Sequence, residues 1–183
     1  MAVACASAGF VAACASAPLA TYDLGAADGG FSARRERPGQ IAIYEPTALP
    51  PVDSNRIVVR MGQDQIAYLS GAKWTDQLPS LVQARLIATF QNAHIGVARL
   101  GMLADYSLRA DIRRFEFDTG RMQVFVEIAA QLTASSTGRI VGGKVFSASA
   151  PAPRDDGGTV TRALDSALGD VMRQIVIWAA PRI

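Results

Sequence analysis

Alternating hydrophobic and polar residues fill most of the second half of the chain. Hydrophobic residues take every second position from Tyr106 to Ile112, and the polar residues that alternate with them include Asp and Arg. The same period of two continues over residues 124–134 and returns over residues 140–150. Asp118-Thr119-Gly120 and Thr137-Gly138 separate the three segments and have the composition of turns. The pattern predicts three long strands in an antiparallel meander, each with one face toward a core and one toward solvent.

A period of three to four residues replaces the alternation in the middle of the chain and predicts an amphipathic helix. Pro79 falls in its first turn, where the missing N–H costs little. We expect Thr75 or Asp76 to cap the N-terminus of this helix. One buried stripe is expected, formed by Leu78, Leu81, Val82, Leu86 and Phe90.

A second amphipathic helix is predicted in the C-terminal part of the sequence. The run Asp155-Asp156-Gly157-Gly158 first interrupts the strand pattern. Hydrophobic residues then recur at helical spacing and define one buried stripe. Its members are Val160, Leu164, Ala167, Leu168, Val171, Ile175 and Trp178.

The first half of the chain carries shorter strand signals. Residues 41–44, 56–60 and 66–69 are short hydrophobic runs, and Gly62-Gln63-Asp64 separates the last two as a hairpin turn would. These segments add strands to the meander. The predicted fold is therefore a single α/β domain with a mixed, largely antiparallel sheet and two long helices.

Composition divides the chain into three parts. Residues 15–39 are rich in Ala, Gly, Pro and charged residues, which indicates a flexible tether, and residues 1–14 have the character of a signal-like leader. Residues 40–181 contain every predicted strand and helix and form the α/β domain. The 183 residues are enough for one domain of ordinary size with a hydrophobic core, and no internal repeat is evident.

Charge and hydropathy argue against two classes of function. The net charge of +2 is small and scattered along the chain, so nucleic-acid binding is not expected. Half of the residues are hydrophobic, yet no run after the leader reaches the roughly 20 apolar residues of a membrane helix.

The leader contains a possible lipidation motif. Val11-Ala12-Ala13-Cys14 places an apolar residue and two small residues before a cysteine, the pattern at which bacterial lipoprotein signal peptides are acylated and cleaved. Cys14 is therefore the predicted lipidation site. No Lys or Arg precedes the apolar run, and Cys5 interrupts it. An Ala-rich leader without a lipid, or a start assigned downstream of the true one, are the alternative interpretations.

Few residues offer catalytic or metal-binding chemistry. Residues 138–144 match the start of a phosphate-binding P-loop, but Val145 stands where Ser or Thr must bind Mg²⁺, and the run lies in a predicted strand. The single His94 follows the first helix with no catalytic partner arranged around it in the sequence. One His and no usable pair of Cys argue against a zinc site. We expect no enzymatic activity, no metal and no cofactor.

Two further features have open interpretations. Asp105, Asp111 and Glu116 alternate with Arg on a predicted strand, which favours a solvated face or an interface. Trp74 stands at the corner between a strand and the first helix. It either anchors this corner or lines a groove for a partner or an acyl chain.

Several short segments resemble those of a known family and occur in the same order. They are Tyr22-Asp23-Leu24, residues 56–60, Ala67-Tyr68-Leu69, Lys73-Trp74-Thr75-Asp76, Asp105-Tyr106-Ser107-Leu108, Arg114-Phe115-Glu116, residues 137–148 and the helix ending at Trp178. On these segments the chain resembles the ABC-type transport auxiliary lipoprotein family. The resemblance implies a fold similar to the anticodon-binding-like fold of the TolB N-terminal domain. It also implies a role beside ABC transporters whose periplasmic subunits carry MCE domains and move lipids between membranes.

The resulting expectation is a periplasmic accessory protein held by a lipid anchor. Ala15 rather than Asp follows Cys14, which favours anchoring in the outer membrane. The expected partner is the MCE-domain subunit, and association into a homo-oligomer is left open. The alternatives are a stand-alone lipoprotein that binds lipids or small molecules in an apolar groove and a lipoprotein hydrolase. The absence of a recognisable nucleophile–base pair argues against the hydrolase.

Overall fold

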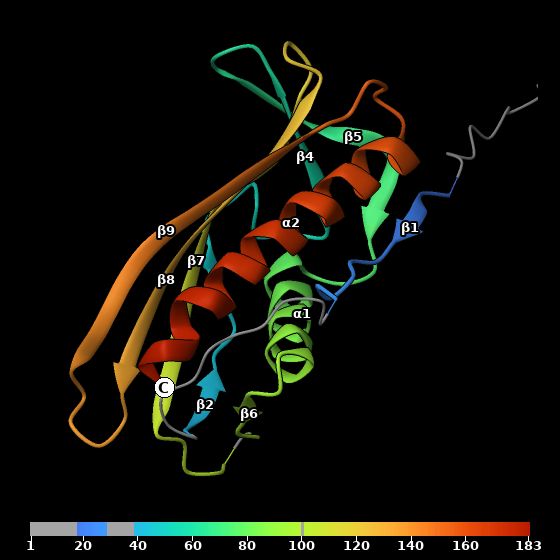
Figure 1. The fold of residues 1–183 in the computed structure, drawn as a ribbon. Coiled ribbons are helices and arrows are strands. Elements are labelled where there is room, and N and C mark those ends of the chain that lie inside the picture. Colours follow the sequence, from blue (N-terminus) through green and yellow to red (C-terminus); the bar gives the residue numbers. More distant parts are fainter. Residues whose placement is uncertain (1–17, 29–38, 100) are drawn as a thin grey trace, which may run out of the picture.

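A mixed β-sheet is the frame of the molecule, and two helices pack on one of its faces (Figure 1). The computed structural model describes residues 18–28, 39–99 and 101–183. The strands in this part of the chain are β1 (Ala20–Tyr22), β2 (Gln40–Ile43), β3 (Thr47–Ala48), β4 (Arg56–Met61), β5 (Gln65–Trp74), β6 (Gly96–Val97), β7 (Tyr106–Asp118), β8 (Gln123–Ala134) and β9 (Ile140–Pro151). The helices are α1 (Leu78–Asn92) and α2 (Gly157–Ala179), the second followed by a short 3₁₀ turn, Ala180–Arg182. The predicted α/β fold, a mixed and largely antiparallel sheet with two long helices, is confirmed.

The predicted antiparallel meander is also confirmed. Strand β8 pairs along almost its whole length with β7 on one side and β9 on the other, and all three strands curve together across the left of Figure 1. Tyr106 lies opposite Ala134 at one end of the first ladder, and Asp118 lies opposite Gln123 at the other. The carboxylate of Asp118 also accepts the Arg121 amide at 3.1 Å and stabilises the first turn.

The other edge of β7 carries three separate parallel partners. Strand β2 pairs with its first residues, β3 with its middle and β4 with its end. Strand β4 then forms the predicted hairpin with β5, around Gly62 at φ 78°. The long pairings of the sheet are therefore antiparallel and the short ones parallel, and β7 is the strand on which both halves of the sheet meet.

Both predicted hydrophobic stripes are buried. All five stripe residues of α1 lie in the core, and those of α2 do so as well except Trp178, which is half-buried and packs edge-to-face on Phe146 at 5.5 Å. The side chain of Asp156 caps α2 by accepting the Thr159 amide at 2.8 Å. No helix in the described ranges combines the length and hydrophobicity needed to span a bilayer.

The predicted N-cap of α1 is wrong. Gln77, not Thr75 or Asp76, is the N-cap residue, and no side chain accepts a capping hydrogen bond there. The Asp76 carboxylate instead accepts the Gln77 amide at 2.7 Å, and the Leu78 amide donates to the Ser54 carbonyl at 3.1 Å. A backbone contact from a distant loop therefore satisfies part of the helix end that a local side chain was expected to cap.

Part of the predicted tether packs on the domain. Within residues 15–39, β1 pairs in parallel with the end of β5, and Leu24 and Ala27 are buried. Asp23 forms an ion pair with Arg85 of α1 at 2.6 Å, and the Ala27 amide donates to the Thr89 hydroxyl at 3.1 Å. The tether prediction is therefore wrong for residues 18–28. Residues 1–17, which include Cys5 and Cys14, and residues 29–38 lie outside the described part of the chain.

Candidate functional site

The helices cover one face of the sheet and leave the opposite one, here called the outer face, open to solvent. Alternation along the strands places charged and aromatic side chains on it, between residues that point into the core. The outer face is formed by Tyr44, Arg56, Arg60, Ile66, Tyr68, Arg109, Asp111, Arg114, Glu116, Phe125 and Glu127.

A buried carboxylate lies at the centre of the outer face. The side chain of Glu116 is 3% exposed and accepts hydrogen bonds from two arginines. Arg60 of β4 donates its Nε to Oε1 at 3.0 Å and its Nη2 to Oε2 at 2.9 Å. Arg114 of β7 donates its Nε and Nη2 to Oε1 at 2.9 and 2.6 Å. Two guanidinium groups thus share one carboxylate, which leaves this centre with one net positive charge.

The ion pairs determine the charge state of the centre. Burial favours the neutral form of Glu116, but the hydrogen bonds from Arg60 and Arg114 outweigh it and hold the pKa of the carboxyl below its usual value. The hydrogen bond to Glu116 likewise raises the pKa of the Arg60 guanidinium. Glu116 and Arg60 are therefore both charged at neutral pH.

The burial of Glu116 contradicts a solvated face at this point of the strand and leaves the alternative interpretation, an interface, in place. A register shift in β7 between Ile112 and Arg114 changes which positions point inward, so that Phe115 and Phe117 enter the core. Glu116 points outward, but β4 pairs alongside it and the loop after β3 lies nearby, so its side chain is covered. Asp105 is exposed and accepts the Gln40 amide at 2.8 Å.

Two hollows flank this centre. One has a volume of about 340 Å³ and combines Glu116 and Arg60 with an apolar rim that includes Leu49, Pro50 and Ile66. Leu49 is 78% exposed, so this rim is open to a partner. The other has a volume of about 430 Å³ and lies among Arg60, Arg114, Arg121 and Asp118, with Gly62, Gln63 and Gly120 completing its lining.

Arginine side chains stack on aromatic rings across the outer face. Arg114 lies 4.6 Å from the centre of the Phe125 ring, and Arg109 lies 4.5 Å from that of Tyr44. Arg56 covers Tyr68 at 5.0 Å where β4 and β5 contribute to the same face. Such pairs hold long charged side chains in place, and Arg and Tyr are enriched at protein–protein interfaces. The outer face therefore has the composition of a docking surface.

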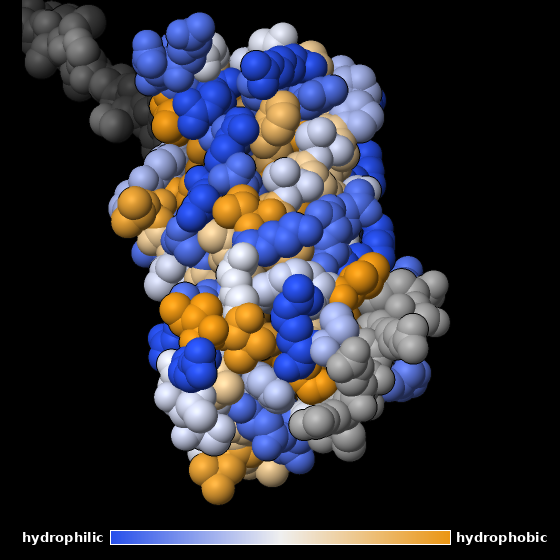
Figure 2. Space-filling model, turned by 60° about the vertical axis from the view of Figure 1, so that its left-hand side comes forward, coloured by the Kyte–Doolittle hydropathy of each residue, from blue (hydrophilic) through white to orange (hydrophobic). Residues whose placement is uncertain are grey.

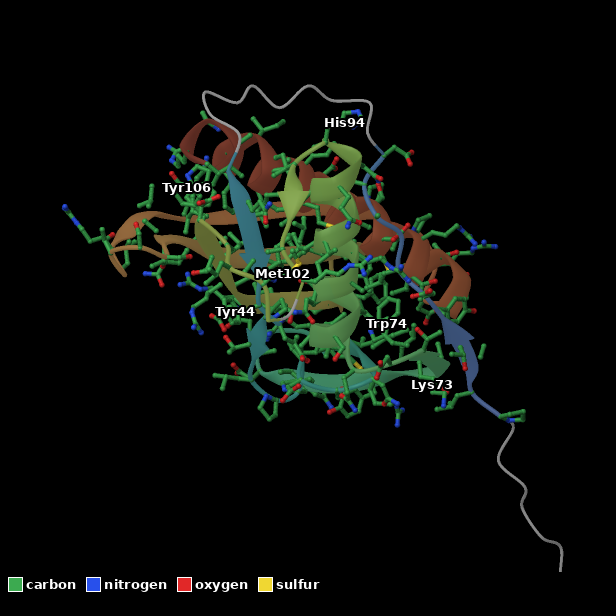
Figure 3. All side chains as sticks on the ribbon, turned by 90° about the horizontal axis from the view of Figure 1, so that it is seen from below. Tyr44, Lys73, Trp74, His94, Met102 and Tyr106 are labelled. Carbon is green, nitrogen blue, oxygen red and sulfur yellow. The ribbon has the colours of Figure 1, made fainter. Side chains whose placement is uncertain are left out.

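The structure separates the residues that the sequence suggested for chemistry. The P-loop-like run lies in the turn at Gly138 and in β9, as expected from its alternation, so it forms no loop ahead of a helix. His94 is exposed at one end of α1, and Trp74 lies at the other (Figure 3). Trp74 is 1% exposed and meets Phe115 edge-to-face at 5.9 Å, which confirms its role as the anchor of the corner rather than the wall of a groove.

The described residues offer no obvious metal site. No three His, Cys, Asp or Glu side chains among them gather in a way that could hold a metal ion. In the same part of the chain, no hydrogen bond or ion pair involves the His94 side chain. The predicted lipidation site, Cys14, lies outside these residues.

Sequence reasoning did not identify the pairing of Arg60 and Arg114 with Glu116. The charged residues of β7 were recognised as a polar face, but Arg60 comes from β4, far away in the chain. The one local signal was an Arg at the end of a hydrophobic strand, Arg56 to Arg60, since the side chain of a strand-end Arg can reach a neighbouring strand.

Comparison with known proteins places the chain in a family. The fold and the outer face define a single-domain α/β protein with a surface suited to docking. A sequence model of the ABC-type transport auxiliary lipoprotein component family matches residues 22–176. The chain belongs to this family, whose name describes lipoproteins that serve as auxiliary components of ABC-type transport. The resemblance drawn from the sequence is confirmed.

Individual proteins are similar to the chain in sequence or in fold. An uncharacterized protein of Bradyrhizobium diazoefficiens is 30% identical over 169 residues, which cover 90% of this chain and 46% of that protein. The chain thus spans about half the length of this relative. A crystal structure of a protein from Xanthomonas campestris has a TM-score of 0.80 at 28% identity, over 88% of this chain and 95% of that one. A hypothetical protein from Chlamydia trachomatis shares the fold, with a TM-score of 0.57 at 9% identity over 79% of this chain and 96% of that one.

Proposed function

We propose that this protein is a lipid-anchored periplasmic accessory component of an MCE-type ABC transport system. In this role it helps to move lipids or hydrophobic compounds between membranes, and its task is to dock on the MCE-domain subunit through the outer face. The single observation that carries the proposal is an uncovered sheet face with fixed arginine–aromatic pairs around a buried carboxylate. Family membership supplies the transport context.

The difference in exposure between the two faces of the sheet supports docking through the outer face. The apolar stripes of both helices are buried in the core and are not free to bind a partner. The outer face instead exposes Tyr44, Tyr68 and the apolar rim at Leu49, next to held guanidinium groups. Aromatic and arginine side chains that surround a desolvated centre are the common arrangement of binding hot spots. An accessory protein of this kind needs contact surfaces and an anchor rather than a nucleotide site.

The anchor belongs to the proposal. A lipid on Cys14 would hold the domain at a membrane, because several acyl chains bind firmly where a single one binds only marginally. The residue after the cysteine, Ala15, favours the outer membrane. In cells fed a clickable palmitate, the wild-type protein and Cys5→Ser should be labelled, and Cys14→Ser should not. Equal labelling of Cys14→Ser would contradict the anchor without affecting the docking surface.

Site-specific crosslinking tests the docking surface in the intact envelope. A photo-crosslinking amino acid replaces Tyr44 on the outer face or, as the matched control, the exposed Arg162 on α2. We expect the MCE-domain subunit to be captured from position 44 and not from position 162. The additional change Arg114→Glu should abolish capture from position 44, because it reverses the charge beside Glu116. Equal capture from both positions would contradict a specific surface.

The alternative function, a stand-alone lipid-binding lipoprotein, gives a different result. Under this alternative, a lipid copurifies with the protein in stoichiometric amount. No envelope protein is captured from position 44. Mass spectrometry of the purified full-length protein measures the lipid directly.

A further inference from the structure

Strand β9 forms the longest open edge of the sheet in the described part of the chain. On the opposite side, β1 covers only residues 72–74 of β5 and leaves residues 65–71 without a strand partner there, and the edge strand β6 has two residues. Strand β9 has 12 residues, and among the described residues it pairs only with β8. In Figure 1 no other labelled element lies beyond β9 on this side. Edge strands of natural proteins are usually short or blocked, because unpaired backbone groups accept another strand.

The register identifies the backbone groups that face outward. In an antiparallel pair, alternate residues of a strand point their N–H and C=O groups toward the partner. The Ala152 amide donates to Met122 on the β8 side, so the even-numbered residues of the strand face β8. The N–H and C=O groups of Gly143, Val145, Ser147 and Ser149 therefore face the open edge. One of them, the Ser147 carbonyl, accepts a long hydrogen bond from Gln174 of α2 at 3.5 Å.

The side chains of β9 permit close approach of another backbone. Its residues are mostly Gly, Ala, Ser and Val, and Pro occurs only at its end, position 151. Gly142 lies close to α2, since an added Cβ would be 3.2 Å from the Trp178 ring. The side of the molecule on which β9 lies comes forward in Figure 2, where apolar residues form separate patches among hydrophilic ones. Ile140, Val145 and Ile177 are exposed in this region.

The charged residues of β9 and of the segments next to its first residues are all basic. Strand β9 contains Lys144 and no acidic residue, and Arg139 precedes it. Arg182 lies close to Gly142 after α2. None of these three cations forms an ion pair with another of the described residues. Among the described residues, the edge therefore combines backbone groups that have no strand partner with cations that form no ion pair.

We propose that the open edge of β9 binds an extended acidic segment of a partner protein as an additional strand. The backbone of the segment pairs with the outward groups from Gly143 to Ser149, and its carboxylates lie against Lys144 and the neighbouring arginines. Addition of a strand to an exposed edge is a general mode of peptide recognition. A second copy of this chain fits less well, because pairing β9 with itself brings no acidic side chain to Lys144. The residues that define the outer face lie on other strands than β9, so each surface can be varied separately.

Two peptides of opposite charge test the proposal on the full-length chain. The probes are the acidic strand peptide TVEVTVEVT and its basic counterpart TVKVTVKVT, each with blocked ends. Hydrogen exchange measured by NMR should show protection of the Gly143, Val145, Ser147 and Ser149 amides when the acidic peptide is added. The basic peptide should bind at least about tenfold more weakly, as expected for repulsion at one charged position.

Matched variants separate backbone pairing from charge. Ser147→Pro removes an outward N–H and leaves the β8 ladder intact, so it should weaken binding of the acidic peptide by about tenfold, whereas Ser147→Ala should bind as the wild type. Lys144→Glu should reverse the preference between the two peptides. Absence of protection at the four amides, or unchanged binding by Ser147→Pro, overturns the proposal. Protection that rises with protein concentration without peptide assigns the edge to a second copy and overturns it too.

Discussion

The two faces of the β7–β8 ladder are formed by alternating residues, and they differ in burial and in chemical character. On β8, the inward side chains of Val124, Val126, Ile128 and Leu132 are almost completely buried under the helices. The residues between them, among them Phe125 and Glu127, are half-buried on the outer face. Residues that build the core and residues of the proposed docking surface thus alternate along one strand. A single substitution can affect either property without the other, provided that its position in the alternation is known.

Glu116 is the exception to this separation. It points to the outer face and is nevertheless buried, because β4 and the two arginines cover it. The outer face therefore has a structural centre of its own, which holds Arg60 and Arg114 in fixed positions. We expect substitutions at this centre to affect both stability and docking.

Removal of a large inward side chain should have the largest effect on stability. Phe117 is fully buried, so Phe117→Ala should lower the free energy of unfolding by about 3–5 kcal/mol through lost burial and the cavity it leaves. The matched change on the outer face is Phe125→Ala, which should cost less than about 1.5 kcal/mol because the ring is partly exposed. Urea denaturation of both variants measures the difference. Equal losses would show that the outer face is packed as tightly as the core.

Neutralising the buried carboxylate should have the next largest effect. Glu116→Gln leaves two guanidinium groups without their counter-charge, and we expect a loss of about 2 kcal/mol, since both arginines are partly exposed and screened. The control Glu127→Gln removes a carboxylate from the same face and should change the free energy of unfolding by less than about 0.5 kcal/mol. A small effect of Glu116→Gln would mean that the centre is not a structural unit.

The contribution of Glu116 should also depend on pH. Its pKa is lowered in the folded protein by the two arginines, so the stabilisation is fully present above the usual glutamate pKa. It is lost as the pH falls through the lowered value, where the folded protein must protonate the group. The difference in unfolding free energy between wild type and Glu116→Gln should therefore stay constant from pH 7 to about pH 5 and shrink between about pH 5 and pH 3. A constant difference across this range contradicts the ionised pair.

The sequence predicted those features that depend on local periodicity. The meander of β7, β8 and β9 follows from alternation, and the stripes of both helices follow from helical spacing. Strand β1 was missed because three residues carry too little pattern, and its pairing with β5 joins distant segments. The N-cap of α1 was missed for a related reason, since the Leu78 amide bonds to the remote Ser54 carbonyl.

The candidate site shows the same limit. The charged residues of β7 were visible as a polar face, but the burial of Glu116 depends on the register shift after Ile112 and on the arrival of β4. Neither can be read from spacing within one strand. The core thus follows from repeated local signals, whereas the centre of the outer face depends on contacts between distant segments.

A substitution at the rim of the outer face should have the smallest effect on stability while it still weakens docking. Arg109 is exposed and stacks on Tyr44 without an ion pair among the described residues, so Arg109→Gln should change the free energy of unfolding by less than about 1 kcal/mol. Under the proposed function, the same change should reduce the MCE-domain subunit recovered with the protein by at least about fivefold, because exposed arginine–aromatic pairs contribute strongly to interfaces. Arg162→Gln on α2 is the control and should change neither quantity. If Arg109→Gln destabilises the protein as much as Glu116→Gln, the Arg109–Tyr44 pair belongs to the structural centre around Glu116. If it leaves recovery of the partner unchanged at wild-type stability, docking does not use this part of the outer face.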